Sequence, residues 1–271
     1  MRYVESMGFS SLWVVTMFHF LPALAMLPLI LSIPNASRED WMRASIAGLL
    51  VGAGFVFYAL GLIVSSVTKT VVLFYMTPIW STIFAYFLIN ERVGLRRWLA
   101  ILGGISGCAL VMNLNGQTIH FNATDLLGLF SGIFWALGSV AVRQFDKINF
   151  LHVTFLQYLF GGFMVVGVVL YIGDPTPTFD AFLKAVPIAF LTSALIFLPT
   201  ALLIFRIMQY VSPGLVGILM LSEALIAALS AAIWLEETLS QWQWLGVIII
   251  LTTGVLIGFH EGKNKNTKKA F

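Results

Sequence analysis

Residues 150–172 read FLHVTFLQYLFGGFMVVGVVLYI and contain no Lys, Arg, Asp or Glu. A hydrocarbon core about 30 Å thick needs about 20 predominantly apolar residues in a helix, so this segment is long enough to cross a membrane. A backbone in lipid has to satisfy its own hydrogen bonds, which favours a helix here. The segment therefore predicts a membrane-spanning helix.

Eight further stretches of similar character fill most of the 271-residue chain. The nine apolar stretches are 9–33, 42–66, 70–89, 95–114, 126–145, 150–172, 182–208, 214–235 and 243–260. Hydrophobic residues make up 59% of the chain and charged residues 10%, against about 25% charged residues in soluble domains. These values predict an all-α polytopic membrane bundle of nine transmembrane helices and exclude an ordinary soluble domain.

The connections between the stretches leave little room for chemistry outside the membrane. The longest, at 115–124, is too short for a catalytic module. Cys108 is the single cysteine, so an intrachain disulfide is impossible, and neither a metal cluster nor a cofactor is expected. The first stretch is too long for a secretory signal and lacks a small-residue cleavage site, which predicts a retained helix.

Basic residues divide unequally between the two sides of the predicted bundle. With the carboxyl terminus in the cytoplasm, only Arg2, Lys69 and Lys184 of the 15 Lys and Arg residues fall outside. The positive-inside rule favours this orientation, with the amino terminus outside, and we expect a bacterial inner membrane. The other basic residues lie at helix ends and in the tail rather than on a folded face, so nucleic acid is not an expected partner.

The chain contains two related halves. The matching pairs are INERVGLRRWLAILGG at 89–104 with LEETLSQWQWLGVIII at 235–250, and MRYVESMGF at 1–9 with VRQFDKINF at 142–150. A complete helix precedes the second member of the latter pair but not the first, so we expect four helices in the first copy and five in the second. A parent repeat of five helices would invert the second copy. Inverted repeats are a feature of secondary transporters, whose sites lie near the midplane.

Three motifs together resemble the EamA-type transporters of the drug/metabolite transporter superfamily. They are FYMTPIWSTIFAYFLINER at 74–92, FSGIFWALGSVAVR at 130–143 and LMLSEALIAALSAAIWLEE at 219–237. The resemblance covers nearly the whole chain and implies two five-helix repeats, with the first of ten helices absent here. It divides the chain into repeat 1 (1–114), repeat 2 (121–260) and a basic cytoplasmic tail (261–271). At Ala224 the family often has a proline, so the second copy lacks the residue that would break its helix.

Glu223 is the most informative residue. A carboxylate about ten residues into a membrane helix costs roughly 2.5–3.5 kcal/mol unless it is hydrated, paired or protonated. Helical spacing places Met220 and residues of mixed polarity on its face. We interpret Glu223 as a proton-coupling site or a site for a cationic group; the alternative is a structural carboxylate bonded to a neighbouring helix.

Pro78 should kink the third stretch, because it removes a backbone donor and frees the carbonyl of Phe74. The kink would open a pocket beside Thr77, the repeat counterpart of Glu223. Trp80, Ser81 and Phe74 share one broad face with Thr77. They predict an aromatic wall with hydroxyl groups, although such stripes also arise from packing alone.

Several polar residues have weaker assignments. Lys69 could meet an anionic substrate group at the outer mouth, or simply extend to the interface. His19 and Gln157 could hydrogen-bond within a cavity or be satisfied buried residues. Glu91 and Glu237 are gate candidates, with surface charge as the simpler alternative.

Glycine pairs spaced four residues apart, Gly103 with Gly107 and Gly128 with Gly132, predict close helix packing rather than chemistry.

The function that this pattern predicts is a secondary carrier that exports a small metabolite, such as an amino acid derivative or drug-like compound, by alternating access with proton coupling. The expected partners are that small molecule, the lipid bilayer and protons, and the sequence leaves a homodimer open. An intramembrane enzyme is disfavoured because no nucleophile with a nearby base and no ligand cluster is present. A non-transporting scaffold or truncated inactive carrier is the remaining alternative.

Overall fold

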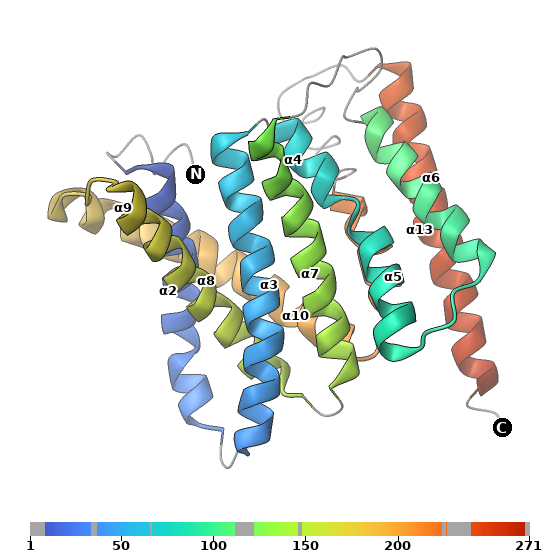
Figure 1. Cartoon of the computed structure of the whole chain (residues 1–271), viewed down its shortest axis with the longest axis horizontal. Coiled ribbons are helices and arrows are strands. Elements are labelled where there is room, and N and C mark those ends of the chain that lie inside the picture. The colour runs from blue at the N-terminus through green and yellow to red at the C-terminus, as the bar shows by residue number, and fades with distance from the viewer. Residues whose placement is uncertain are drawn as a thin grey trace.

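The computed structural model describes residues 9–33, 37–65, 67–111, 122–145, 148–223, 226 and 240–268. These residues form helices and short connections, with no strand among them. The elements are α2 (Ser11–Leu31), α3 (Arg38–Val64), α4 (Val67–Phe74), α5 (Thr77–Ile89), α6 (Leu95–Val111), η1 (Ala123–Asp125), α7 (Leu126–Gln144), α8 (Phe150–Ile172), α9 (Phe179–Thr192), the π-turn η2 (Ser193–Phe197), α10 (Leu198–Met208), α11 (Pro213–Met220) and α13 (Gln241–Lys268). The predicted all-α bundle is confirmed (Figure 1).

Within the described residues, six helical segments are long and apolar enough to cross a membrane. They are Ser11–Leu31, Arg38–Val64, Lys69–Ile89, Ala123–Gln144, Phe150–Ile172 and Phe179–Met208. A shorter apolar helix covers Gln241–Ile257, and α6 has 17 residues. The predicted total of nine stays a prediction, because residues 227–239 lie outside the described ranges.

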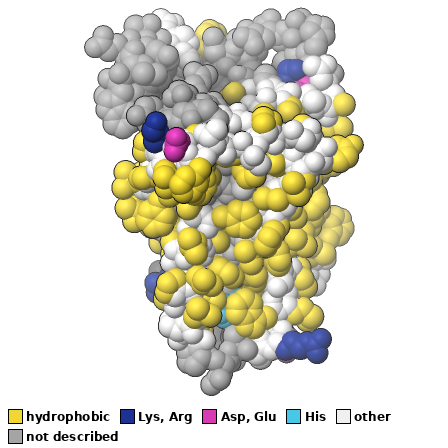
Figure 2. All heavy atoms as spheres, turned by 90° about the vertical axis from the view of Figure 1, so that its left-hand side faces the viewer, with side chains coloured by type: hydrophobic (Ala, Val, Ile, Leu, Met, Phe, Trp, Pro, Cys, Tyr) yellow, Lys and Arg dark blue, Asp and Glu magenta, His cyan; other side chains and the backbone are white. Residues whose placement is uncertain are grey.

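The surface between the two ends of the bundle is apolar. Figure 2 shows hydrophobic side chains across the middle of one face, with Lys, Arg, Asp and Glu side chains toward the ends. Large exposed side chains include Leu24 of α2 and Phe182 and Phe190 of α9. Such a continuous apolar surface is stable in lipid and not in water, so the chain is an integral membrane protein.

Helix α3 lies between α7 and α8 (Figure 1). A methyl group added at Gly52 of α3 would lie 2.8 Å from the backbone oxygen of Gln157 on α8. On the other side, a methyl group at Gly138 of α7 would lie 2.4 Å from Val51 Cγ2 and 2.9 Å from the Val51 nitrogen. The three helices therefore touch backbone to backbone, which only small residues allow.

The predicted glycine contacts are confirmed. A methyl group at Gly128 of α7 would lie 2.9 Å from the Thr70 Cα, and one at Gly132 would lie 3.2 Å from the Phe74 oxygen. On α6, a methyl group at Gly107 would lie 2.9 Å from the backbone oxygen of Gly246 on α13. Each pair thus marks a close helix crossing.

The third predicted stretch is broken into α4 and α5 by a turn at Tyr75 and Met76. Pro78 stands in the first turn of α5, where the missing N–H has no intrahelical acceptor to lose. The hydroxyl of Thr77 donates to the carbonyl of Phe74. The kink and the freed carbonyl expected from Pro78 are both confirmed, and the Thr77 side chain satisfies that carbonyl.

A second break precedes Glu223. Helix α11 ends at Met220, Leu221 lies in a turn, and Ser222 and Glu223 are helical again. Leu221 is buried beside Gly104 of α6, where an added methyl group would lie 2.5 Å from Leu221 Cδ1. The chain therefore turns without the proline that the family often has, and packing against α6 accommodates the turn.

Helices α6 and α13 run antiparallel. Gln243, near the start of α13, donates to the backbone oxygen of Val111 at the end of α6 (3.2 Å), and Gly103 faces Thr253 further along α13. The α5–α6 connection and the start of α13 thus lie at opposite ends of the bundle (Figure 1). Inverted repeats would require this placement.

We predict that Gly138→Ala destabilises the protein by about 1–3 kcal/mol, because the added methyl group overlaps the α3 backbone. Gly167→Ala is the matched control, since nothing lies within 4 Å of a methyl group at that position. Thermal unfolding in detergent measures both. Equal melting temperatures for the two variants would contradict the tight α3–α7 contact.

Cysteine labelling tests the orientation. In a Cys108→Ala background, we expect Gly94→Cys to react with a membrane-impermeant maleimide only from the cytoplasmic side and Ser240→Cys only from the outer side. Both positions are exposed, whereas Cys108 is buried. Labelling of both new cysteines from one side would rule out the opposite placement of the two loops.

Candidate functional site

Glu223 lies at mid-depth in the bundle. It follows Pro213, the first residue of α11, by ten positions, which correspond to about 15 Å of helix. A hydrocarbon core is about 30 Å thick, so the carboxylate lies about halfway across. The residue is exposed in the structure.

Aromatic side chains from three separate segments surround this position. Phe74, at the end of α4, lies 4.8 Å from Tyr58 of α3 and 6.5 Å from Trp135 of α7, measured between ring centroids. Tyr75, in the turn after α4, lies 6.0 Å from Phe74. Phe74, Tyr75 and Trp135 are buried, so the wall is rigid.

The carboxylate of Glu223 acts electrostatically on the hydroxyl groups of both Tyr58 and Tyr75. Among the residues that the structure describes, none forms a hydrogen bond or an ion pair with that carboxylate. Within these ranges no neighbouring helix holds it as the structural alternative would require. A negative charge beside aromatic rings suits a positively charged group.

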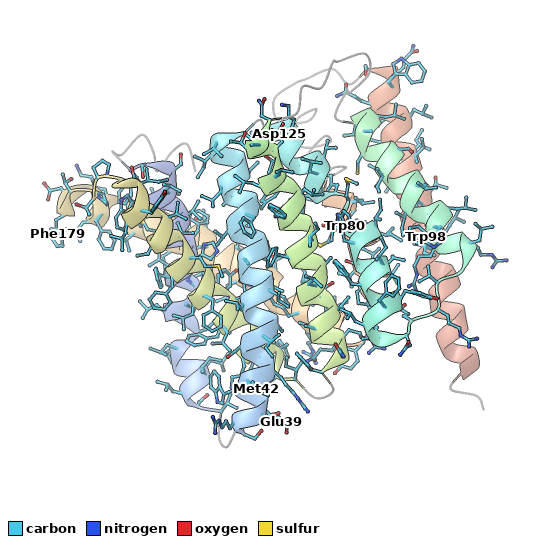
Figure 3. The ribbon with its side chains drawn as sticks, viewed as in Figure 1. Glu39, Met42, Trp80, Trp98, Asp125 and Phe179 are labelled. Atoms are coloured by element: carbon cyan, nitrogen blue, oxygen red, sulfur yellow. The ribbon has the colours of Figure 1, made fainter. Side chains whose placement is uncertain are left out.

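The other predicted residues of the third stretch lie close to this wall. Thr77 and Pro78 begin α5, and a methyl group added at Gly217 of α11 would lie 2.9 Å from the Pro78 Cα. Trp80 stacks on Phe84 at 6.4 Å (Figure 3). The Ser81 hydroxyl is buried and has no hydrogen-bond partner in the described part of the chain.

Met220, the last residue of α11, packs against the same buried cluster. The structure thus brings Glu223, Phe74, Thr77, Pro78 and Met220 to one region.

Lys69 belongs to a polar cluster at one end of the bundle. Its ammonium lies 3.0 Å from Asp125 Oδ2, and Ser65 donates to the other carboxylate oxygen. The backbone nitrogen of Asn122 donates to Asp125 as well (2.8 Å). Figure 3 shows Asp125 and Glu39 at opposite ends. Lys69 therefore ties α4 to the start of α7.

Glu91 forms an ion pair at the other end. Its carboxylate lies 2.6 Å from Arg97, and both side chains are mostly buried. Arg97 also lies beside Gly214 at the start of α11, where an added methyl group would be 3.5 Å from Arg97 Cδ. The pair thus connects the α5–α6 connection to α11. Its proposed counterpart, Glu237, lies outside the described residues.

His19 lies on α2 and Gln157 on α8. The Nδ1–H of His19 donates to the backbone oxygen of Val15 (2.9 Å), and the ring packs over Gly161 of α8. The side-chain oxygen of Gln157 is buried without a partner among the described residues. Within the described residues, no ring contact or hydrogen bond joins either residue to the aromatic rings named above.

Tyr58 and Asp125 are site residues that sequence reasoning missed. A tyrosine in the middle of an apolar stretch was a usable signal for the first. For Asp125 the signal was the pattern Asn-x-x-Asp before an apolar run, which forms a capping box here.

Comparison with known proteins identifies the family. The sequence matches the EamA-like transporter family over residues 1–113 and 122–259. The chain belongs to this family. The resemblance noted in the sequence is confirmed, and the family that the chain matches is one of membrane transporters.

Among curated relatives, the chain is 30% identical over 98 residues to an S-adenosylmethionine uptake transporter of Rickettsia felis, covering 36% of this chain and 33% of that protein. It is 24% identical over 156 residues to the uncharacterized transporter YoaV of Bacillus subtilis, covering 56% and 53%. The chain thus spans about a third to a half of these relatives. A solved crystal structure superposes with a TM-score of 0.68 at 16% identity over 91% of this chain and 88% of that one, which shows the fold alone.

We predict that Asp125→Asn destabilises the protein by about 1–3 kcal/mol, because it removes the charge that Lys69 and Ser65 contact. Glu39→Gln is the matched control: it breaks an exposed helical ion pair with Arg43 worth about 0.3–0.5 kcal/mol. Thermal unfolding in detergent compares them. A loss from Glu39→Gln as large as that from Asp125→Asn would contradict the assignment.

Proposed function

We propose that the chain is a secondary carrier of a small metabolite that bears a positively charged group. The observation that carries this proposal is the Glu223 carboxylate at mid-depth beside Tyr58 and Tyr75, with Phe74 and Trp135 completing an aromatic wall. A cation gains both from the carboxylate and from the faces of the rings. Two antiparallel halves that alternate in exposing this site would move the substrate across the membrane.

The relatives are compatible with such a substrate. The Rickettsia proteins are named S-adenosylmethionine uptake transporters, and S-adenosylmethionine carries a positively charged sulfonium group. The match covers a third of those proteins, so S-adenosylmethionine serves here as the first probe.

Coupling to protons follows from a single carboxylate. Glu223 can hold either a proton or a cationic group, so the two ligands compete for one site. A carrier with one site for these two competing ligands moves one of them across the membrane in exchange for the other. In a bacterial inner membrane, where the proton gradient points inward, the exchange would drive the substrate outward, which makes the chain an exporter in its proposed setting.

The test is flux in proteoliposomes that contain labelled S-adenosylmethionine under an imposed pH gradient. We expect Glu223→Gln to reduce gradient-driven flux about tenfold or more, since a hydrogen bond or ion pair to a charged group contributes about 1.5–3 kcal/mol. Tyr58→Phe should reduce it less, because the ring remains. Glu39→Gln, an exposed carboxylate at the end of the bundle, is the control and should transport normally.

Two outcomes would contradict the proposal. Unchanged pH-driven flux in Glu223→Gln would remove proton coupling through this residue. If S-adenosylmethionine is not moved, metabolite profiles of cells that lack or overproduce the chain give the substrate, and a substrate without a cationic group would overturn the assigned class.

A further inference from the structure

A groove lies between α6 and α13 at the end of the bundle where α6 begins. Its volume is about 430 Å³. The lining residues are Arg96, Leu99 and Ala100 of α6 and Thr253, Leu256 and Ile257 of α13. The site lies apart from Glu223 and from the aromatic wall, and the transport cycle proposed above makes no use of it.

The walls of the groove face lipid. Leu99 is 59% exposed and Leu256 is 65% exposed, so an apolar chain could lie along both side chains. The two helices are held together further along by contacts at Gly103 and Gly107. The groove therefore lies on a closely packed helix pair, and apolar side chains make up most of its lining.

The edge of the groove at the start of α6 carries a positive charge. Arg96 is exposed there, in the first turn of α6, where the free backbone N–H groups of a helix also favour an anion. The same end carries Arg92 in the α5–α6 connection. Trp98, two residues further along α6 and labelled in Figure 3, is a residue type that prefers the headgroup level.

We propose that this groove binds an anionic phospholipid. The positive charge of Arg96 lies near the phosphate, and an acyl chain lies along Leu99 and Leu256. Charge complementarity and the combination of a headgroup-level cation with an apolar slot favour a lipid over a second copy of the chain, whose helix would place an apolar surface against Arg96. Inorganic phosphate, which has no acyl chain, would leave the apolar part of the groove empty.

The experiment is native mass spectrometry of the delipidated full-length protein titrated with phosphatidylglycerol or phosphatidylcholine. We expect phosphatidylglycerol to bind more tightly. Arg96→Gln should weaken it about fivefold, in line with the contribution of one basic residue near an anionic lipid surface, while Arg96→Lys should retain most binding. Ala100→Leu fills the slot without changing charge and should weaken both lipids.

Arg92→Gln is the matched control, because Arg92 carries the same charge at the same end but does not line the groove. Equal losses from Arg92→Gln and Arg96→Gln would overturn the proposal in favour of diffuse surface charge. Full displacement by millimolar inorganic phosphate would assign the site to free phosphate, and a dimer that Ala100→Leu dissociates would assign the groove to a second copy. Each of these two results would also overturn the proposal of a phospholipid site. Circular dichroism confirms that each variant is folded.

Discussion

Close contact of α3 with α7 and α8 is the constraint on which the rest of the structure depends. Apolar burial gives little drive for association between helices in lipid, because the tails are as apolar as the side chains. Dispersion between closely fitted surfaces has to hold them instead. Gly52 and Gly138 allow the backbones to touch on both sides of α3. The position of α3 in turn sets Tyr58 against Phe74, and so the wall of the candidate site.

Breaks in the helices are confined to the interior for a related reason. A turn within the membrane frees backbone groups that lipid cannot satisfy, so protein groups have to do so. The Thr77 hydroxyl meets the carbonyl of Phe74 at the first break, and Leu221 packs beside α6 at the second. The contact of Gly217 with Pro78 joins the two broken segments. Glu223 follows the second break by two positions.

The local sequence pattern was sufficient to predict the structural features that depend on residues close together in the chain. The apolar stretches, the break at Pro78 and the close approach at Gly128 and Gly107 all follow from residue type and spacing, and the structure has them. The turn at Leu221 was not predictable from the sequence. It depends on the space that the absent side chain of Gly104 leaves for Leu221, and Gly104 is more than a hundred positions away in the sequence. The pairing of Lys69 with Asp125 likewise joins segments that only the folded bundle brings together.

Charge at the centre and ion pairs at the ends suggest how the proposed carrier would avoid leak. An empty, ionised Glu223 is costly to enclose, because a buried charge without a partner loses its hydration. A bound proton or cation neutralises the carboxylate and removes that cost. Only the loaded forms would then rearrange between the two sides of the membrane, near which the ion pairs Lys69–Asp125 and Glu91–Arg97 lie. A carboxylate that has to be neutralised before the carrier rearranges would therefore favour exchange over leak.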